Sequence, residues 1–528
     1  MKQIDAKSML LQKTHPRAIM IHGYGTSAAL PLNTQVHIDN SNVDTSDLLS
    51  QLVRDRLDRP QRHRLLHGFP LAHSMPFIDS TTRQAVEDGD SRFQHSFHPD
   101  KPLLIGVLPH SYCNPKIAGC GFCTFPHEDF SSRKATAAVN GVIQEIQSRV
   151  ASSPQLQRKS IDALYLGGAT ANLTPAEPFR RLCRQLNDSF DLRSAEVTLE
   201  GVPAFFLNRK PWLLDILQEE LPARHFRISM GIQSFSKQWQ ARMGRTGFGD
   251  SKVFEEVVEL AHSRKMTASG DLLYNLPGQS LDEMLADISC GDQIGLDQIC
   301  LYHLVMFRGL ATPWSRDPEL IASLPDNAKA ASNWEAIRAL AIETGYHQTT
   351  LTNFEKKSFQ GDSRSYIYEL RSFETDRYNM IGFGPSGISY SSTGPRNFGL
   401  KTMNPESSIE YLQAVAKQGP VWNRYFKFDA ESQRLLYITR QLSKMSVDRT
   451  RYREVFGTDI VADYRVEMKA LVESHLVEVD EKSIRLTVRG MFFSDTVASV
   501  LAHGRDGRKL GREAADRMSS KGNEGGFM

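Results

Sequence analysis

Three cysteines lie close together in the run Cys113-Asn-Pro-Lys-Ile-Ala-Gly-Cys120-Gly-Phe-Cys123. Three thiolates on one short loop can hold three irons of a [4Fe-4S] cluster and leave the fourth iron open to a small molecule. The same thiolates could bind zinc, with His110 or His127 as the fourth ligand, because zinc takes such a set in tetrahedral geometry. The cysteines alone leave both metals open.

Composition limits the classes of protein to which this chain can belong. With 528 residues, 40% of them hydrophobic, the chain can bury the cores of two or three domains. It carries 63 basic and 61 acidic side chains, a net charge of +2, so no overall field favours a nucleic-acid partner. The other cysteines, Cys183, Cys290 and Cys300, are scattered in apolar periodic segments, and we expect no disulfide framework.

The chain has no run near the roughly 20 apolar residues that span a bilayer, so we expect no membrane partner. Its first residues, Met-Lys-Gln-Ile-Asp-Ala-Lys-Ser, lack the apolar stretch of a secretory signal. We therefore expect a cytoplasmic location, where a reducing environment suits exposed thiolates and an oxygen-sensitive cluster.

From about residue 103 to 305, short apolar runs alternate with amphipathic stretches, which is typical of repeated βα units. Strands are predicted at Leu103–Leu108, Ile161–Leu166, Glu196–Glu200, Phe226–Ile232, Ala268–Tyr274 and Gln298–His303. Helices are predicted at Val139–Val150, Pro178–Leu186, Trp212–Glu219, Lys252–Ser263 and Leu281–Asp292. Six parallel strands with crossover helices give an α/β fold, a partial (β/α)6 barrel of the TIM type that binds ligands at the carboxyl ends of its strands.

Several motifs follow these strands, and they would converge at one rim of the barrel. The cysteine loop follows the first strand, and Leu166-Gly-Gly-Ala-Thr170 ends the second. Glycines there let backbone N–H groups approach the charged end of a ligand, although a tight turn alone would also need them. The later strands contribute Glu200, Arg227-Ile-Ser-Met-Gly-Ile-Gln233, Met243-Gly-Arg245 and Gly270-Asp271.

In this order, after a three-cysteine loop, the motifs resemble the radical S-adenosylmethionine family, and within it the oxygen-independent coproporphyrinogen III oxidase-like (HemN-like) subfamily. The resemblance runs from about residue 103 to 500 and includes Tyr378-Asn-Met-Ile-Gly-Phe-Gly-Pro-Ser-Gly-Ile388 and a terminal segment similar to a winged helix. It favours an iron-sulfur cluster over zinc.

The resemblance implies a [4Fe-4S] cluster on Cys113, Cys120 and Cys123. Its open iron would chelate S-adenosylmethionine, and an electron would break the sulfonium bond to give methionine and a 5'-deoxyadenosyl radical. The positions that match the cofactor contacts of the family are Phe122, Gly168, Ala169, Thr170, Glu200, Gln233, Arg245, Asp271, Val305 and Ile388.

Catalytic roles are expected for Glu200, Arg245 and Asp271. A second S-adenosylmethionine is implied by the positions that match Gln233, Arg245 and Asp271, since an arginine can clamp a carboxylate and an aspartate can accept from an ammonium group. A structural ion pair between Arg245 and Asp271 is the alternative interpretation.

The chain departs from the family pattern at three places. Six residues, instead of three, separate Cys113 from Cys120, and Gly-Gly-Ala-Thr-Ala stands for Gly-Gly-Gly-Thr-Pro. Val107 occupies the position of a tyrosine that matters in the decarboxylase. The leading hypothesis is therefore methyl or methylene transfer from a second S-adenosylmethionine to an sp2 carbon of a small natural product, by C-methylation or cyclopropanation.

Two alternatives remain. One is a porphyrin-acting enzyme, which decarboxylates coproporphyrinogen or methylates and opens a haem ring, with the arginine-rich residues 54–64 receiving propionates. The other is a haem chaperone, in which His63, His67 or His303 ligates iron. For an enzyme of either kind we expect a reductant such as flavodoxin or ferredoxin as a partner.

The pattern also predicts a division of the chain. Residues 1–100 would be an extension that forms a lid, 101–310 the barrel, 311–425 a barrel-completing segment, 426–502 a winged-helix-like domain and 503–528 a disordered tail. The last domain is expected to contain helices at Ala430–Leu442, Ile460–Glu473 and Met491–Leu501, and a hairpin at 476–487.

Overall fold

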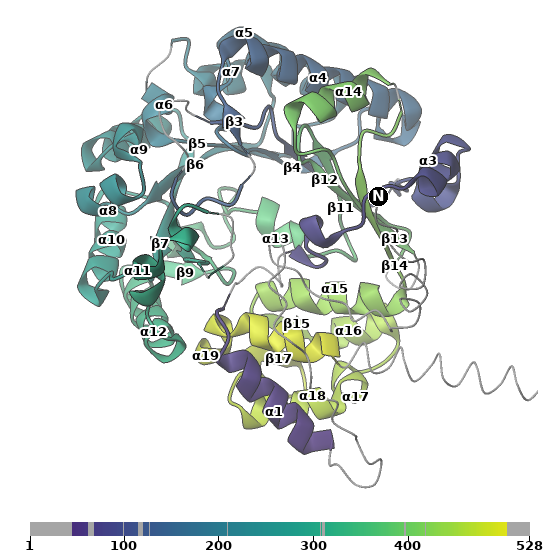
Figure 1. Ribbon diagram of the computed structural model, residues 1–528. Coiled ribbons are helices and arrows are strands. Elements are labelled where there is room, and N and C mark those ends of the chain that lie inside the picture. The colour runs from purple at the N-terminus through teal and green to yellow at the C-terminus, as the bar shows by residue number, and fades with distance from the viewer. Residues whose placement is uncertain are drawn as a thin grey trace, which may run out of the picture.

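A computed structural model describes residues 45–61, 68–98, 100–113, 120–125, 127–207, 210–306, 308, 312–394, 398–417 and 419–503. Its main feature is one curved sheet, with helices along its outer side and a group of carboxyl-terminal helices across its open side (Figure 1). Among the described helices, none combines the length and the apolar character needed to cross a membrane.

The six predicted strands form the parallel centre of this sheet. They are β1 (Leu103–Val107), β4 (Ile161–Leu166), β5 (Glu196–Gly201), β6 (His225–Gln233), β7 (Thr267–Tyr274) and β8 (Gln298–His303). Each pairs in parallel with the next. The predicted partial (β/α)6 barrel is confirmed, because apolar side chains buried on both faces of these strands require helices on one side and a filled interior on the other.

The sheet continues beyond the predicted strands at both edges. β11 (Asn379–Phe383) pairs in parallel with β1, and β12 (Ile388–Ser392), β13 (Gly399–Met403) and β14 (Arg424–Phe428) add antiparallel strands. At the other edge β10 (Asn353–Lys356) pairs antiparallel with β8, and β9 (Tyr346–Gln348) pairs antiparallel with β10. The result is a sheet of twelve strands.

Five crossover helices match the predicted ones. They are α4 (Ser132–Ser152), α5 (Ala176–Ser189), α7 (Leu213–Glu220), α9 (Ser251–Ser263) and α10 (Leu281–Gln293). Ser131, Asp250 and Ser280 cap three of them by accepting a backbone N–H of the first turn. α4 begins seven residues before the predicted start, because small buried alanines there carry little of the amphipathic signal.

The described residues also contain further helices. Before residue 430 they are α1 (Thr45–Leu57), α3 (Ser80–Glu87), α6 (Pro203–Leu207), α8 (Lys237–Arg242), α11 (Pro318–Ala322), α12 (Asn327–Glu343), α13 (Tyr368–Ser372) and α14 (Ser408–Ala416). A two-stranded pair, β2 (Tyr112–Cys113) and β3 (Glu128–Asp129), flanks the cysteine loop.

The carboxyl-terminal region contains α15 (Ala430–Ser443), α16 (Arg449–Phe456), α17 (Ile460–Asp463), α18 (Arg465–Glu473) and α19 (Val488–Phe492). The predicted hairpin is present as β16 (Val477–Val479) and β17 (Ser483–Leu486), and β15 (Ser446–Asp448) joins it. Two predicted helices are interrupted, one at Tyr464 and the other at Phe493. The predicted division of the chain at residues 100, 310, 425 and 502 stays a prediction.

Candidate functional site

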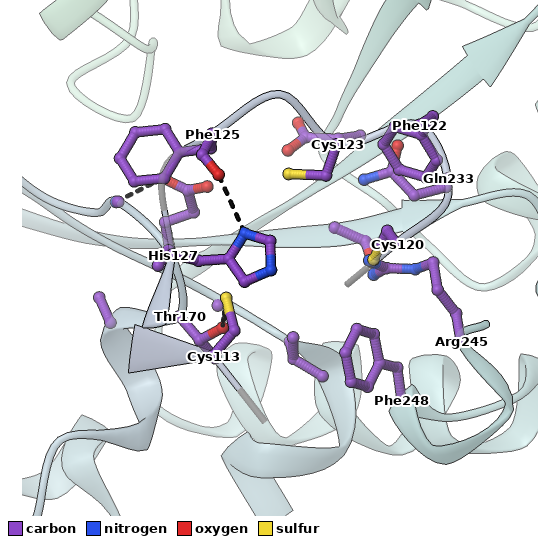
Figure 2. Close-up of a pocket in the computed structure, with 18 residues that line it drawn as sticks. Cys113, Cys120, Phe122, Cys123, Phe125, His127, Thr170, Gln233, Arg245 and Phe248 are labelled. Atoms are coloured by element: carbon purple, nitrogen blue, oxygen red, sulfur yellow. Dashed lines mark hydrogen bonds between the residues drawn. The ribbon is translucent and has the colours of Figure 1, made fainter. Parts of the chain in front are cut away.

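The carboxyl ends of the central strands enclose a cavity of 230 Å³ (Figure 2). It brings together all of the predicted site residues except two. The predicted residues that line it are Cys113, Cys120, Phe122, Cys123, Gly168, Ala169, Thr170, Glu200, Gln233, Arg245 and Asp271. We call this space the cysteine cavity.

Side chains from two different segments donate hydrogen bonds to Cys113 and Cys120. Thr170 Oγ1 donates to Cys113 Sγ (3.3 Å), and Arg245 Nη1 donates to Cys120 Sγ (3.1 Å). Burial, with a smaller contribution from the negative charges of the other two cysteines, raises the pKa of the Cys113 thiol to about 11 against the opposing hydrogen bond from Thr170. Positive charge placed among these sulfurs would relieve both effects.

The sulfurs fit a cluster better than one metal ion. Zinc bound by three of them would hold the sulfurs within about 3.8 Å of one another, given Zn–S bonds of about 2.3 Å in tetrahedral geometry. Within the described residues no three metal-ligating side chains form such a compact group. A [4Fe-4S] cube places each thiolate on a separate iron and so needs wider spacing, as the three sulfurs spread around the cavity in Figure 2 allow.

The two histidines that the zinc alternative requires are placed differently. His127 lies in the cysteine cavity, where its Nδ1 donates to the carbonyl of Phe125 (3.0 Å). His110 is fully buried and does not line the cavity; its ring stacks on Tyr112, and burial lowers its pKa to about 4. A tetrahedral site that includes His110 is therefore wrong.

Neighbouring elements contact Gly121 and Phe122, which lie between Cys120 and Cys123. The ring of Phe122 packs edge-on against Trp314 at 6.1 Å, and the backbone N–H of Trp314 donates to the carbonyl of Gly121 (3.0 Å). On the other side, the Gly121 N–H donates to the carbonyl of Met243 (3.3 Å). Contacts from two distant segments thus hold Phe122 at the cavity wall.

The glycine pair after β4 lets this loop approach the carboxyl group of Glu200. A Cβ on Gly167 would lie 2.5 Å from Glu200 Oε2, so a larger residue would displace that carboxyl group. Gly168 has φ of +113°, and a Cβ there would meet Leu108 at 3.1 Å. The Gly168 N–H donates to Glu200 (3.4 Å). Because the glycines have no side chains, the turn lines the cavity with backbone atoms.

A bulge in β6 aims Gln233 into the cavity. The pairing of β6 with β7 shifts between Gly231 and Gln233, and Gln233 has φ of +71°, which is unusual for a residue with a side chain. Such backbone strain is concentrated at functional sites. Arg245 donates to the Gly231 carbonyl as well as to Cys120, so its guanidinium group faces the bulge. The described contacts of the Arg245 side chain thus include no hydrogen bond to Asp271, although the charge of Arg245 lowers the pKa of that carboxyl group.

The carboxyl groups of two half-buried residues, Glu200 and Asp271, line the cavity. Burial, and then the charge of Asp271, raise the pKa of Glu200 to about 7, against hydrogen bonds from Gly168 and Tyr165. Burial also raises the pKa of Asp271 to about 6, against a hydrogen bond from Cys300 and the charges of two arginines. A cation in the cavity would favour the ionised form of both groups.

A second cavity, of 430 Å³, adjoins the first; Gly168 and Phe125 line both. We call it the aromatic cavity. Most of its lining is apolar or aromatic, and it also contains two cationic side chains. The lining residues that matter below are Tyr165, Tyr368, Met380, Ser386, Ile388, Tyr390, Lys401, Phe428, Leu436 and Arg440.

The two remaining predicted site residues lie elsewhere. Ile388, at the start of β12, lines the aromatic cavity and not the cysteine cavity. Val305, half-buried just after β8, is not in the lining of either one. Sequence reasoning missed Phe125 and Phe248 in the cysteine cavity, although Phe125 follows Cys123 by two residues, and it named His127 only as a zinc ligand.

Of the candidate haem and propionate ligands, His303, Arg54 and Arg56 lie within the described residues, and none of these three lines the cavities. His303 packs between Tyr274 (5.4 Å) and Phe492 (5.1 Å). Arg54 and Arg56 lie on α1, which packs against α18, and neither lines the cavities. Arg62, His63, Arg64 and His67, which the alternatives also used, lie outside the described residues.

Comparison with known proteins identifies the class. The chain is 22% identical over 383 residues to a haem chaperone, HemW, of Lactococcus lactis subsp. lactis, covering 72% of this chain and 92% of that protein. It is 23% identical over 418 residues to the oxygen-independent coproporphyrinogen III oxidase of Escherichia coli K12 (74% and 84%). It is 32% identical over 236 residues to an anaerobilin synthase of Escherichia coli O157:H7 (44% and 50%). No family model matches.

The solved structure of coproporphyrinogen III oxidase from Escherichia coli, described as a radical SAM enzyme, has the same fold. It superposes with a TM-score of 0.62 at 20% identity, over 80% of this chain and 93% of that one. The distant relatives and the shared fold confirm the predicted resemblance to the radical S-adenosylmethionine superfamily and, within it, to the coproporphyrinogen III oxidase-like (HemN-like) group. That resemblance implies a [4Fe-4S] cluster and S-adenosylmethionine.

Proposed function

We propose that this chain is a radical S-adenosylmethionine enzyme whose substrate is a tetrapyrrole bound in the aromatic cavity. One observation carries the proposal: the aromatic cavity opens beside the cysteine cavity, and the turn at Gly168 belongs to both. A radical formed on one side would therefore arise next to a large apolar substrate on the other. Several relatives carry names that refer to haem or porphyrin, which supports this substrate class over the methyl-transfer hypothesis.

When bound, the cluster supplies the electron that breaks the sulfonium bond of S-adenosylmethionine into methionine and a 5'-deoxyadenosyl radical. The residues of the chain bind and orient the reactants. Glu200 and Asp271 offer carboxylates to the cationic cofactor, and Arg245 and Thr170 stabilise two thiolates by hydrogen bonds. The apolar walls of the neighbouring cavity keep water from the radical.

The proposal is tested with anaerobically reconstituted protein, a reductant such as flavodoxin, and S-adenosylmethionine. We expect 5'-deoxyadenosine to form, and its rate to rise when coproporphyrinogen III or haem is added. A tetrapyrrole deuterated at the attacked position should transfer deuterium to 5'-deoxyadenosine. Formation of 5'-deoxyadenosine that no tetrapyrrole accelerates would contradict the substrate class.

The same assay separates the other two hypotheses. A haem chaperone would bind the tetrapyrrole without consuming S-adenosylmethionine. Methyl or methylene transfer remains the second candidate, since Gln233, Arg245 and Asp271 all reach the cysteine cavity. With a deuterated methyl group on the cofactor, that reaction would place deuterium in the product and in 5'-deoxyadenosine.

A further inference from the structure

Two cationic side chains enter the aromatic cavity from different elements. Lys401 lies in the middle of β13, is only 5% exposed, and lines the cavity beside Tyr390 of the neighbouring strand. Arg440 comes from α15, the helix that crosses the open side of the barrel in Figure 1. Their charges act on each other, so they lie within electrostatic reach.

Within the part of the chain that the structure describes, no carboxylate pairs with Lys401. Its ammonium group donates to two backbone carbonyls, those of Gly68 (3.1 Å) and Pro70 (2.7 Å), and so keeps one N–H for another acceptor. Burial, and then repulsion by Arg440, hold the pKa of Lys401 well below its usual value. A buried ammonium group without a carboxylate partner is costly, and the usual remedies are loss of the proton or binding of an anion.

Arg440 is also incompletely satisfied. Its Nε is buried and has no hydrogen-bond partner in the described structure, while the face of Phe373 lies 5.8 Å away. The nearest acidic influence is Glu369, but burial raises the pKa of that carboxyl group to about 8. At neutral pH Glu369 is therefore mostly protonated, and it does little to offset the guanidinium charge.

The rest of the cavity is suited to a flat apolar body. Tyr165 and Tyr368 pack at 5.1 Å on one side, and Tyr390 and Phe428 at 5.6 Å on another. Ser386, at the turn between β11 and β12, adds a buried hydroxyl without a partner. A ligand that satisfies all of these groups has an aromatic or conjugated body and at least one carboxylate.

We propose that Lys401 and Arg440 form a carboxylate clamp, which binds an acidic side chain of the substrate and so fixes which part of the apolar body faces Gly168. The clamp rests on the proposed function for the identity of the substrate. Without the proposed function, the clamp is still a site for an apolar carboxylic acid, since the two unbalanced cations and the aromatic walls do not depend on a tetrapyrrole.

The test compares charged and neutral forms of the same ligands by quenching of tryptophan fluorescence in the cluster-loaded full chain. One pair is mesoporphyrin and its dimethyl ester, and the other is pyrenebutyrate and its amide. We expect the wild type to bind each acid about tenfold more tightly than its neutral form, because a charge-assisted hydrogen bond contributes about 1.5–3 kcal/mol. Lys401→Met and Arg440→Met should lose that preference while binding the neutral forms unchanged.

Two further variants serve as controls. Arg440→Lys keeps the charge and should restore part of the preference. Lys427→Met removes an exposed lysine of the next strand, β14, and should leave the preference intact. Equal binding of acid and neutral forms by the wild type would overturn the clamp, as would a preference that both methionine variants retain. Loss of the preference for pyrenebutyrate in the variants, without any response to porphyrins, would keep the clamp and refute the tetrapyrrole.

Discussion

The two adjoining cavities differ in the charge of the groups that they bury. The cysteine cavity contains three thiols and the carboxyl groups of Glu200 and Asp271, and therefore favours positively charged ligands. The aromatic cavity contains Lys401 and Arg440 among rings, and favours an anion with an apolar body. Gly168 and Phe125 belong to both. On the proposed function, the contrast places the cationic cofactor on one side and the acidic substrate on the other.

The largest expected effect follows from removing one of the three thiols that we assign to the cluster. Cys123→Ala should lower the iron content from about four per chain and abolish 5'-deoxyadenosine, because three thiolates hold the cluster. Cys290→Ala is the matched control, since this half-buried cysteine of α10 lies outside the cavity lining. Iron and sulfide analysis with EPR of the reduced protein measures both variants. An intact signal in Cys123→Ala would contradict the assignment.

The ionisation of the two carboxyl groups should make cofactor binding in the cysteine cavity depend on pH. The pKa of Glu200 is about 7 and that of Asp271 about 6, so both become negative as the pH rises through this range. Binding of cationic S-adenosylmethionine should strengthen from pH 5.5 to 8. Glu200→Gln should weaken it about tenfold at pH 8 and flatten the upper part of the profile.

Calorimetry at several pH values checks this expectation. S-adenosylhomocysteine, which lacks the sulfonium charge, is the matched ligand, and its affinity should change less with pH. A wild-type profile without pH dependence would show that these carboxyl groups do not contact the cofactor's positive charge.

The shared wall can be tested with a pair of glycines. Gly168→Ala forces a side chain into a left-handed conformation against Leu108 and should cost about 1–3 kcal/mol of folding stability. Gly278→Ala has a similar φ, +80°, with open space around the added methyl group. Both should lower the melting temperature, but only Gly168→Ala should impair formation of 5'-deoxyadenosine. Equal activities would mean that the turn is structural alone.

The smallest expected effect concerns Tyr165, which lines the aromatic cavity and donates a hydrogen bond to Glu200 in the other one. That bond lowers the pKa of Glu200, so Tyr165→Phe should move the pH dependence of cofactor binding to higher pH and change the affinity at pH 8 little. Tyr368→Phe alters the other ring of the pair as a control. If the pH dependence of cofactor binding does not shift in Tyr165→Phe, this tyrosine does not couple the two cavities electrostatically.

The cysteine cavity could be predicted because its parts are local. Each motif follows a strand whose apolar run is visible in the sequence, and parallel strands bring their carboxyl ends to one edge. Although the pairing of β6 is irregular next to Gln233, this residue still lines the cysteine cavity. The two predicted residues that do not line the cysteine cavity, Val305 and Ile388, were taken from the family pattern and not from such a local signal.

The aromatic cavity could not be predicted in this way. Lys401, Arg440 and Gly68 are separated by long stretches of chain, and nothing in their local sequence pairs them. The edge strands β11 to β14 are short, and the pairing of β11 with β1 joins residues that are far apart in the chain, such as Leu103 and Asn379. The interruption at Tyr464 likewise has no local breaker such as proline or glycine.

The sequence by itself determined the order of the strands, the three cysteines and the carboxyl groups at the rim, because periodic burial and strand-end motifs act over a few residues. Only the tertiary structure decided that β11 would extend the sheet at β1 and that α15 would carry Arg440 to Lys401. Those contacts arise when distant apolar surfaces are buried together, and that burial depends on the whole chain.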